Sequence, residues 1–412
     1  MQYGKKERTL QNFRKEHLCK FMKTAGIIAE YNPFHKGHQY QIQKIKEQTG
    51  ADFIIVVMSG DFMQRGAPAL IDKYSRTAMA LAGGVDIVFE LPVLFATSSS
   101  ENFARAGVAL LNQLGNVDYL CFGSELGNLA PLKEAANLLI NEPVELSSIL
   151  KEAMRAGNSF PVARNKALSS FLPYEESTWT SPNNLLAIEY LKAIEYVHSS
   201  ITPITIKREG SFHSDAIDTS FASASAIRKA LAHAKDVTAK IPRESLPYLS
   251  NHQLDWEDLY DFLSIEILKN WTNLTDYLDI STELSNRIQN VFSKSCSMEE
   301  LCQNLKTKQY TYTRIQRGLL HILLGIKKDF KTDYAPYARV LGFRKEKSSF
   351  FKEVSSSIPL VTKMTKFHHP LLDLEIKASS IYELALKNKY QCKDLKNEFT
   401  RGMIIYSQSS DN

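Results

Sequence analysis

The 412-residue sequence predicts an α/β fold, in which a parallel sheet covered by helices on both faces is followed by an α-helical C-terminal domain. Two observations carry this prediction. Continuous apolar runs alternate with segments of helical periodicity over the first half of the chain, and such runs are typical of strands buried on both sides. After about Leu231 the helical pattern continues with polar connections and little strand signal.

The elements of the sheet domain follow one another in regular order. The first strand stops at Asn32-Pro33, and Ile42 and Ile45 within residues 39–48 indicate a helix that starts near His38. The remaining elements are expected as a strand over 52–58, a helix over 73–83, a strand over 85–91, a helix over 101–114, a strand over 118–122, helices over 131–197 with the clearest at 183–196, a strand over 201–207 and a helix that opens at Ser223.

Composition and charge limit the function classes. The net charge of +5 equals that of residues 1–23, which hold seven Lys/Arg and two Asp/Glu, and the rest is balanced, so any RNA-binding argument must rest on local patches. The longest apolar runs, 53–58 and 318–326, fall short of the roughly 20 residues of a membrane-spanning helix. Five scattered cysteines form no disulfide framework, which indicates a reducing cytoplasm. We divide the chain into a basic extension (1–21), a sheet domain (22–235) and a helical domain (236–412).

The strongest local signal is His35-Lys36-Gly37-His38, directly after the first strand. Free N–H groups at a helix start bind anions, Gly37 allows close backbone approach, and both imidazoles can donate to phosphate oxygens. The alternatives are a structural role and a metal site. A metal site is disfavoured because no Cys or carboxylate follows at ligand spacing and Lys36 would repel a cation. The motif therefore predicts a phosphate site.

A second candidate anion site lies at Ser223, Ser225 and Arg228, which bring hydroxyls, free N–H groups and a fixed cation to one helix start. Ser before a helix is most often only an N-cap, but this helix follows the last predicted strand and should share an edge with His35. Two phosphate sites without a Walker-type loop suit attack on an α-phosphate with pyrophosphate leaving. His35, His38 and Arg228 would act by positioning and charge stabilisation, with Mg²⁺ carried by the nucleotide and no metal held by protein ligands.

Six sequence blocks, read together, resemble one family. They are residues 25–40, 58–66 (Met-Ser-Gly-Asp-Phe-Met-Gln-Arg-Gly), 83–92, 122–125 (Phe-Gly-Ser-Glu), 182–184 (Pro-Asn-Asn) and 223–228. This set is similar to the tRNA(Met) cytidine acetate ligases, within the His-x-Gly-His nucleotidyltransferase superfamily. The resemblance implies a Rossmann-like nucleotidyltransferase domain over 22–235 and a tRNA-binding role for 236–412.

The resemblance also implies a reaction. The enzyme would use ATP to convert acetate to acetyl-adenylate and would transfer the acetyl group to N4 of the wobble cytidine of elongator tRNA(Met), giving N4-acetylcytidine in the cytoplasm. No membrane or protein partner is implied. The residues implied to contact ATP are Ile28, Ala29, Glu30, Tyr31, Asn32, Pro33, Phe34, His35, Lys36, Gly37, His38, Gln39, Tyr40, Gln41, Gly123, Asn183, Arg208, Glu209, Ser223 and Ser225.

Two other function classes fit the same residues. A small-molecule adenylyltransferase or carboxylate–amine ligase would use the same ATP site with a metabolite as acceptor. A non-catalytic RNA-binding protein that keeps a relic nucleotide fold would fail to bind ATP despite intact His35 and His38. An ATP-dependent reaction that needs RNA distinguishes the first interpretation from both.

A polar block of Asp61, Gln64, Arg65, Lys73 and Arg76 follows the second strand. One interpretation is a solvated loop followed by an ordinary charged helix. The other gives Arg65 a functional contact with a carboxylate or an RNA phosphate.

The C-terminal part contains a basic and aromatic segment, 306–352, with twelve Lys/Arg against three Asp/Glu. Its aromatic residues are Tyr310, Tyr312, Phe330, Tyr334, Tyr337, Phe343, Phe350 and Phe351. The segment is either an RNA surface or a core helix with a solvated basic face. Lys363-Met364-Thr365-Lys366 resembles the Lys-Met-Ser-Lys loop of class I synthetases, but we expect a solvated basic loop because no strand precedes it to bring it back to the ATP.

Overall fold

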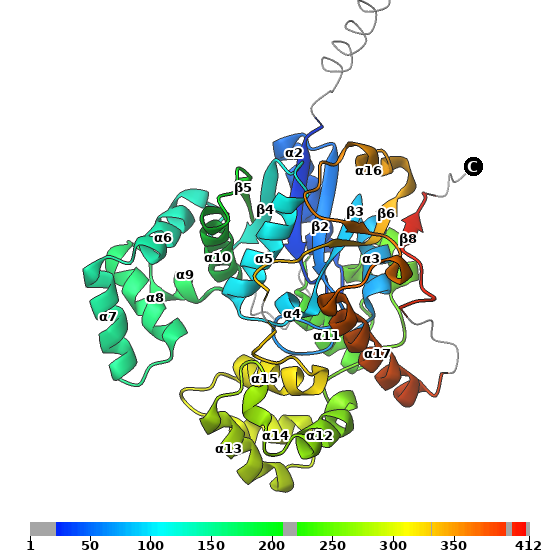
Figure 1. The fold of residues 1–412 in the computed structure, drawn as a ribbon. Coiled ribbons are helices and arrows are strands. Elements are labelled where there is room, and N and C mark those ends of the chain that lie inside the picture. The colour runs from blue at the N-terminus through cyan, green and yellow to red at the C-terminus, as the bar shows by residue number, and fades with distance from the viewer. Residues whose placement is uncertain (1–21, 209–220, 331, 393–397, 409–412) are drawn as a thin grey trace, which may run out of the picture.

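A single sheet organises the protein, which is represented here by a computed structural model describing residues 22–208, 221–330, 332–392 and 398–408. Within these ranges the sheet has eight strands in the order β5–β4–β1–β2–β3–β6–β7, with β8 paired to β6 (Figure 1). The strands are β1 (Thr24–Ala29), β2 (Phe53–Ser59), β3 (Ile87–Leu91), β4 (Tyr119–Ser124), β5 (Thr202–Lys207), β6 (Ala338–Arg344), β7 (Leu360–Val361) and β8 (Ile404–Tyr406). The predicted extension 1–21 lies outside the described residues.

The five strands β1 to β5 are mutually parallel, as the sequence predicts. Every residue of β2 is buried, because helices cover both faces of the sheet. In the β1–β2 register Ala29 pairs with Met58, so the two strands end side by side. The loops after them therefore meet at one edge of the sheet.

Helices α2, α3 and α11 cover one face, and α5 and α10 cover the other. Ile42 and Ile45 of α2 are buried in the core between the sheet and α2, α3 and α11. Ile28 of β1 points to the other face, where it packs against Gly107 of α5. The helices of this part are α2 (Lys36–Thr49), α3 (Lys73–Ala82), α4 (Val93–Ala96), α5 (Ser100–Gln113), α6 (Leu129–Asn141), α7 (Val144–Arg155), α8 (Phe160–Phe171), α9 (Glu176–Thr180), α10 (Pro182–Tyr196) and α11 (Ala224–Ala232).

The helical prediction for residues 131–197 is confirmed by α6 to α10. Helices α6 to α8 project from the sheet domain beside α10 (Figure 1). They carry a small core of their own, formed by Leu146, Leu150, Ala163 and Ala167. None of the helices in the described ranges is long and apolar enough to cross a membrane.

The C-terminal part is mainly helical, as predicted, but it also supplies three short strands that the sequence did not reveal. Strand β6 pairs antiparallel with β3, and β7 and β8 pair with β6, so this part completes the sheet. The division at residue 235 stays a prediction. The helices here are α12 (Tyr260–Lys269), α13 (Thr282–Val291), α14 (Met298–Leu305), α15 (Tyr312–Leu324), α16 (Phe350–Glu353) and α17 (Pro370–Tyr390).

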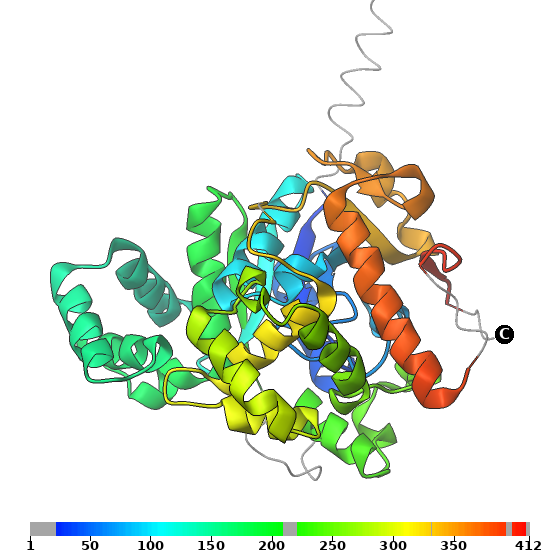
Figure 2. The same cartoon turned by 60° about the horizontal axis from the view of Figure 1, so that its bottom comes forward.

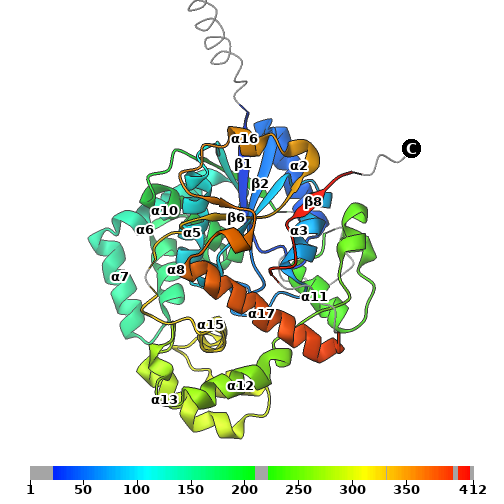
Figure 3. The same ribbon diagram turned by 45° about the vertical axis from the view of Figure 1, so that its right-hand side comes forward.

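Helices α12 to α15 lie beyond the edge at which β1 to β3 end, and Figure 2 shows this side brought forward. The loop after β2 docks on them at Gly66, where φ is +78° and an added Cβ would overlap the backbone of Gln316 and Arg317 in α15. Helix α17 crosses the same end of the sheet and packs against α4 and α15 (Figure 3). The candidate site edge therefore borders the C-terminal helices.

The segment Lys363–Lys366 is preceded by a strand after all, the two-residue β7, which corrects the argument made from the sequence. Its residues Met364–Lys366 form a single 3₁₀ turn. Strand β7 pairs with β6 at the opposite end of the strand order from β4, and it runs antiparallel to β3. Strands β2, β3 and β6 lie between β7 and β1 in the sheet, so this segment still has no place beside His35.

Candidate nucleotide-binding site

The loop after β1 turns the chain sharply into α2. Tyr31 adopts a left-handed conformation with φ of +47°, and the Asn32–Pro33 peptide is cis. Helix α2 starts at Lys36, two residues before the predicted start, with His35 as its N-cap. The N-terminus of this helix, where the helix dipole favours an anion, therefore follows directly on the end of β1.

The two histidines form a reciprocal cap. The Nδ1 atom of His35 accepts from the Gly37 N–H at 3.1 Å, and the Nδ1 atom of His38 accepts from the His35 N–H at 3.3 Å. The rings stack with their centroids 3.7 Å apart. Because each Nδ1 accepts, the proton of each neutral ring lies on Nε2, which leaves two N–H donors side by side.

Both imidazoles are kept neutral. Burial lowers the pKa of His35 to about 3, with Arg208 and Arg228 adding to the effect, and burial together with the neighbouring His35 holds the pKa of His38 well below its usual value. Only 5% of the His35 surface is exposed. The pair therefore suits hydrogen bonding to an anion whose charge is balanced by the nearby arginines.

Arg228 of α11 reaches the loop after β1, as predicted. Its Nη1 donates to the Asn32 carbonyl at 2.7 Å and its Nη2 donates to the Ser225 Oγ at 3.1 Å. Ser223 is the N-cap of α11, and its Oγ accepts from the Ala226 N–H at 3.1 Å. The structure thus brings the two predicted anion sites together, although both serines are occupied by local contacts.

Gly123, Asn183 and Arg208 meet at the end of β4. The Arg208 Nη1 donates to the Asn183 Oδ1 at 3.1 Å, and a Cβ at Gly123 would lie 3.3 Å from the Arg208 side chain. The Asn183 Nδ2 donates to Glu125 Oε1 at 2.6 Å, and Glu125 Oε2 accepts from the Asn184 N–H at 2.9 Å. These contacts fix the orientation of the Asn183 amide.

Glu125 contacts the candidate site through Asn183, a contact that the sequence interpretation missed although Glu125 lies in one of the quoted blocks. The side chain of Asn184 also binds this loop: its Oδ1 accepts from the Glu125 N–H at 3.0 Å and from the Leu126 N–H at 3.2 Å. The signal available in the sequence was a carboxylate after a strand and an Asn-Asn pair at a helix start. Their pairing across 58 residues could not be read from spacing alone.

The other residues implied to contact ATP differ in how deeply their side chains are buried. Ile28, Tyr31 and Phe34 are buried, and a Cβ at Gly83 would overlap the Phe34 ring, so these three can offer only backbone atoms to a nucleotide. The Glu30 carboxylate accepts from the Gln64 N–H at 2.8 Å. The other residues of the loop after β1 and the first turns of α2 that are implied to contact ATP are buried or half-buried. They are Ala29, Asn32, Pro33, Lys36, Gly37, Gln39, Tyr40 and Gln41. Glu209 lies outside the described residues.

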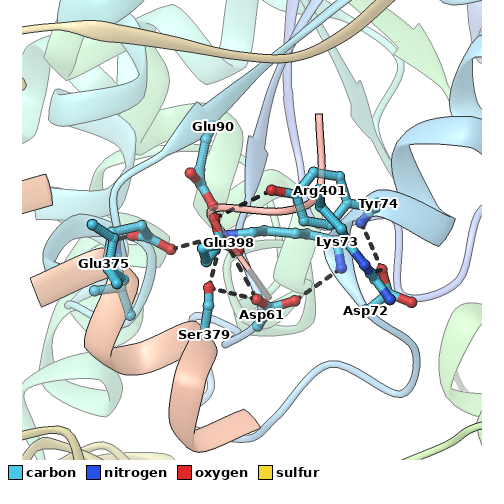
Figure 4. A network of polar contacts seen from close by, with 12 residues as sticks. Asp61, Asp72, Lys73, Tyr74, Glu90, Glu375, Ser379, Glu398 and Arg401 are labelled. Atoms are coloured by element: carbon cyan, nitrogen blue, oxygen red, sulfur yellow. Dashed lines mark hydrogen bonds and ion pairs between the residues drawn. The ribbon is translucent and has the colours of Figure 1, made fainter. Parts of the chain in front are cut away.

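Asp61, Lys73 and Arg76 of the polar block after β2 are buried, which corrects the interpretation as a solvated loop and charged helix for these three, whereas Arg65 is exposed and its functional contact stays a prediction. Lys73 is completely buried, and its Nζ lies 2.6 Å from Glu90 Oε1 and 2.9 Å from Glu398 Oε1. Its Nζ also donates to Ser379 Oγ at 2.8 Å, and Ser379 Oγ donates to Asp61 Oδ2 at 2.8 Å (Figure 4). Residues from α3, β3, α17 and the C-terminal segment thus share one buried network.

The protonation of this network follows from its excess of carboxylates. Burial and the neighbouring Glu90 raise the pKa of Glu375 well above its usual value, which favours its protonated form. Although burial acts against it, Lys73 and Arg339 lower the pKa of Glu398 to about 2. Arg339 also donates to Glu90 Oε2 at 2.6 Å. The network joins the C-terminal part to the loop after β2.

The basic segment 306–352 contains both core and surface residues. Arg339 belongs to the buried network, and Tyr310, Tyr337 and Phe350 are buried, so none of these can stack on RNA bases. Tyr312 is 37% exposed, and the exposed cations include Lys306 and Lys308. Among the described residues of the segment, those that are exposed or half-buried can serve the predicted RNA surface, which stays a prediction.

Within the ranges that the structure describes, no group of three or more His, Cys, Asp or Glu side chains could hold a metal ion. The groups that gather at the site are N–H donors and guanidinium groups, which suit an anion. Positive potential and directed N–H groups at a helix start are what a triphosphate requires.

Known proteins show the same organisation. The HIGH Nucleotidyl Transferase family matches residues 22–398. The tRNA(Met) cytidine acetate ligase of Clostridium perfringens is 41% identical over 381 residues, which cover 88% of this chain and 95% of that protein. The protein of the same name from Caldicellulosiruptor saccharolyticus is 40% identical over 399 residues, 93% of this chain and 98% of its own.

Two solved structures share the fold across nearly the whole chain. Thermotoga maritima TmcAL bound with alpha-thio ATP superposes with a TM-score of 0.84, and its apo form superposes with a TM-score of 0.85. Each is 30% identical to this chain, covering 94% of it and 100% of the solved chain.

Proposed function

This chain belongs to the tRNA(Met) cytidine acetate ligase family of HIGH nucleotidyl transferases, and we propose that it acetylates a cytidine of elongator tRNA(Met) at the expense of ATP. The observation that carries the proposal is the pair of neutral imidazoles at the start of α2, which lie close to the positive charges of Arg208 and Arg228. ATP is the nucleotide, as in the ligand of the Thermotoga maritima structure.

The reaction has two steps. A carboxylate oxygen of acetate attacks the α-phosphorus of ATP, and pyrophosphate leaves to give acetyl-adenylate. The N4 amine of the wobble cytidine then attacks the acetyl carbonyl carbon, N4 loses a proton, and AMP leaves. No group of the protein is covalently modified in either step.

The roles proposed for the residues follow from their contacts. The Nε2–H groups of His35 and His38 donate to phosphate oxygens, where they stabilise the charge that develops as pyrophosphate leaves. Arg228 holds the loop after β1 through the Asn32 carbonyl and supplies positive charge. Gly123, Asn183 and Arg208 complete the nucleotide pocket, with Glu125 fixing the Asn183 amide.

Mg²⁺ enters this proposal only as an ion carried by the ATP phosphates, where it neutralises charge. The C-terminal part, residues 236–412, would bind the tRNA, with the exposed cations of residues 306–352 in contact with its phosphates. We place the reaction in the cytoplasm, where ATP and tRNA are found. A small-molecule adenylyltransferase or carboxylate–amine ligase remains the alternative, since it would use the same ATP site.

The test is to incubate the purified protein with ATP, Mg²⁺, labelled acetate and elongator tRNA(Met), and then to digest the RNA to nucleosides. Label in N4-acetylcytidine is the expected result, and a transcript with uridine at the wobble position is the control that should stay unlabelled. Formation of AMP and pyrophosphate without labelled RNA would support the alternative. No acetate-dependent reaction at all would refute the proposed acetate ligase activity.

A further inference from the structure

Arg76 of α3 has an unusual set of partners for a completely buried arginine. Its Nε donates to the Ile71 carbonyl at 3.1 Å, and its Nη1 donates to the carbonyls of Glu30 at 2.7 Å and Ser59 at 3.0 Å. Its Nη2 donates to the Gly60 carbonyl. All four acceptors are therefore main-chain oxygens, and none is a carboxylate.

The acceptors have a common location at the ends of two neighbouring strands. The β1–β2 ladder ends at the Ala29–Met58 pair, and Glu30 and Ser59 are the next residues on each strand. Buried carbonyls beyond the end of a ladder need other donors. Arg76 donates to the carbonyls at the ends of both strands. Its side chain therefore links the start of the loop after β1 to the start of the loop after β2.

The tie lies just before the histidines. Glu30 begins the three-residue segment 30–32, and Asn32 is held at its other end by the Leu70 N–H, which donates to its Oδ1 at 2.8 Å, and by Arg228. Leu70 of the loop after β2 and Arg76 of α3 therefore hold this segment together. The positions of His35 and His38, a few residues on, depend on that segment.

We propose that Arg76 is a positioning residue for adenylate formation, which sets the places of His35 and His38 through segment 30–32 without touching the nucleotide. The inference rests on the proposed function for its assay. A planar fork of five N–H donors can reach four carbonyls at fixed angles, whereas a lysine ammonium has three donors on one atom. Arg76→Lys therefore keeps the charge and loses the geometry.

The experiment compares Arg76→Lys and Arg76→Ala with wild type in acetate-dependent ATP–pyrophosphate exchange, normalised to the folded fraction. A displacement of about 1 Å at the reacting groups can cost about 100-fold in rate, so kcat should fall by that order in both variants while tRNA affinity is unchanged. Millimolar guanidinium should restore at least about tenfold to Arg76→Ala, and urea at the same concentration should not.

The matched control is Arg164→Ala, which removes another buried arginine, on the projecting helix α8, where it pairs with Glu189 of α10 at 3.1 Å. It should lose stability but keep the wild-type kcat per folded molecule. Values of kcat within threefold of wild type for Arg76→Lys and Arg76→Ala would overturn the proposal. Failure of both variants to fold would also overturn it, because Arg76 would then support the whole domain and not the site.

A second measurement separates this inference from the proposed function. In ¹⁵N-histidine spectra the wild type should show His35 and His38 as Nε2–H tautomers, and Arg76→Ala should mix their tautomers. If wild type shows no exchange activity, the proposed function fails while these spectra still decide the role of Arg76. Unchanged histidine resonances in Arg76→Ala would count against it whatever the activity.

Discussion

The imidazoles of His35 and His38 stack with their centroids 3.7 Å apart, and each Nδ1 accepts a main-chain N–H from the same helix start. This relationship fixes the tautomer of both rings before any ligand arrives. It converts a four-residue motif into a preorganised pair of donors, which costs no reorganisation during reaction.

The depressed pKa of His35 predicts that acid destabilises the protein. The pKa is about 3 in the folded state and near 6.5 in the unfolded state, so between these values the unfolded chain binds more protons. Stability is therefore complete above about pH 6.5 and falls as the pH drops towards 3. For this one group the loss at pH 5 should be about 2 kcal/mol.

Urea unfolding of wild type and His35→Asn at pH 5 and pH 7.5 measures this effect. The difference in unfolding free energy between the two pH values should be smaller in the variant by about that amount. An equal pH dependence in both proteins would show that His35 is not held neutral by the fold.

Glu125→Gln should weaken ATP binding without impairing the chemical step. A glutamine offers one acceptor oxygen, so either the Asn183 Nδ2 or the Asn184 N–H loses its partner. We expect the KM for ATP to rise about tenfold, the effect of one lost charged hydrogen bond, with kcat within about threefold. Exposed Glu134→Gln on α6 is the control for steady-state kinetics, and the same KM in both variants would refute the role of Glu125.

Lys73→Met should be severely destabilising. The change leaves Glu90, Glu398 and Asp61 buried without their central cation, and breaking a buried ion pair from one side costs about 3–5 kcal/mol. Lys269→Met, which removes an exposed pair with Glu266 at 2.7 Å, should cost less than about 1 kcal/mol. Denaturant unfolding of both variants decides whether the network stabilises the fold or is neutral.

The double variant Lys306→Ala/Lys308→Ala should bind tRNA more weakly if the exposed part of segment 306–352 contacts RNA. Loss of two phosphate contacts should lower the slope of log Kd against log salt by about 1 to 2. The pair Lys133→Ala/Lys151→Ala, exposed on α6 and α7, should leave the slope unchanged. The opposite pattern would move the RNA to the projecting helices.

Much of the site edge could be predicted from the sequence because its signals are local. Continuous apolar runs identified the parallel strands, and parallel strands must end at one edge, which is why His35 and Arg228 were expected together. The helix start at Lys36 differs by two residues from the prediction, since the reciprocal cap of His35 and His38 depends on ring orientation.

What the sequence could not predict depends on pairs far apart in the chain. Strand β6 contains Arg339, and a charged residue in the sequence predicts an exposed position. The ion pair of Arg339 with Glu90, 249 residues away, explains why it is buried. Lys73 and Arg76 read as a solvated helix start for the same reason, because their partners lie on other elements. Local periodicity carries no information about such partners.

The most direct test of the central claim is acetate-dependent ATP–pyrophosphate exchange by His38→Asn, beside wild type and the exposed control His368→Ala. Loss of one preorganised donor should lower the exchange rate by about 100-fold or more, while tRNA affinity and the control stay at wild-type values. Exchange by His38→Asn at the wild-type rate would contradict the account, because the paired imidazoles would then take no part in forming the adenylate.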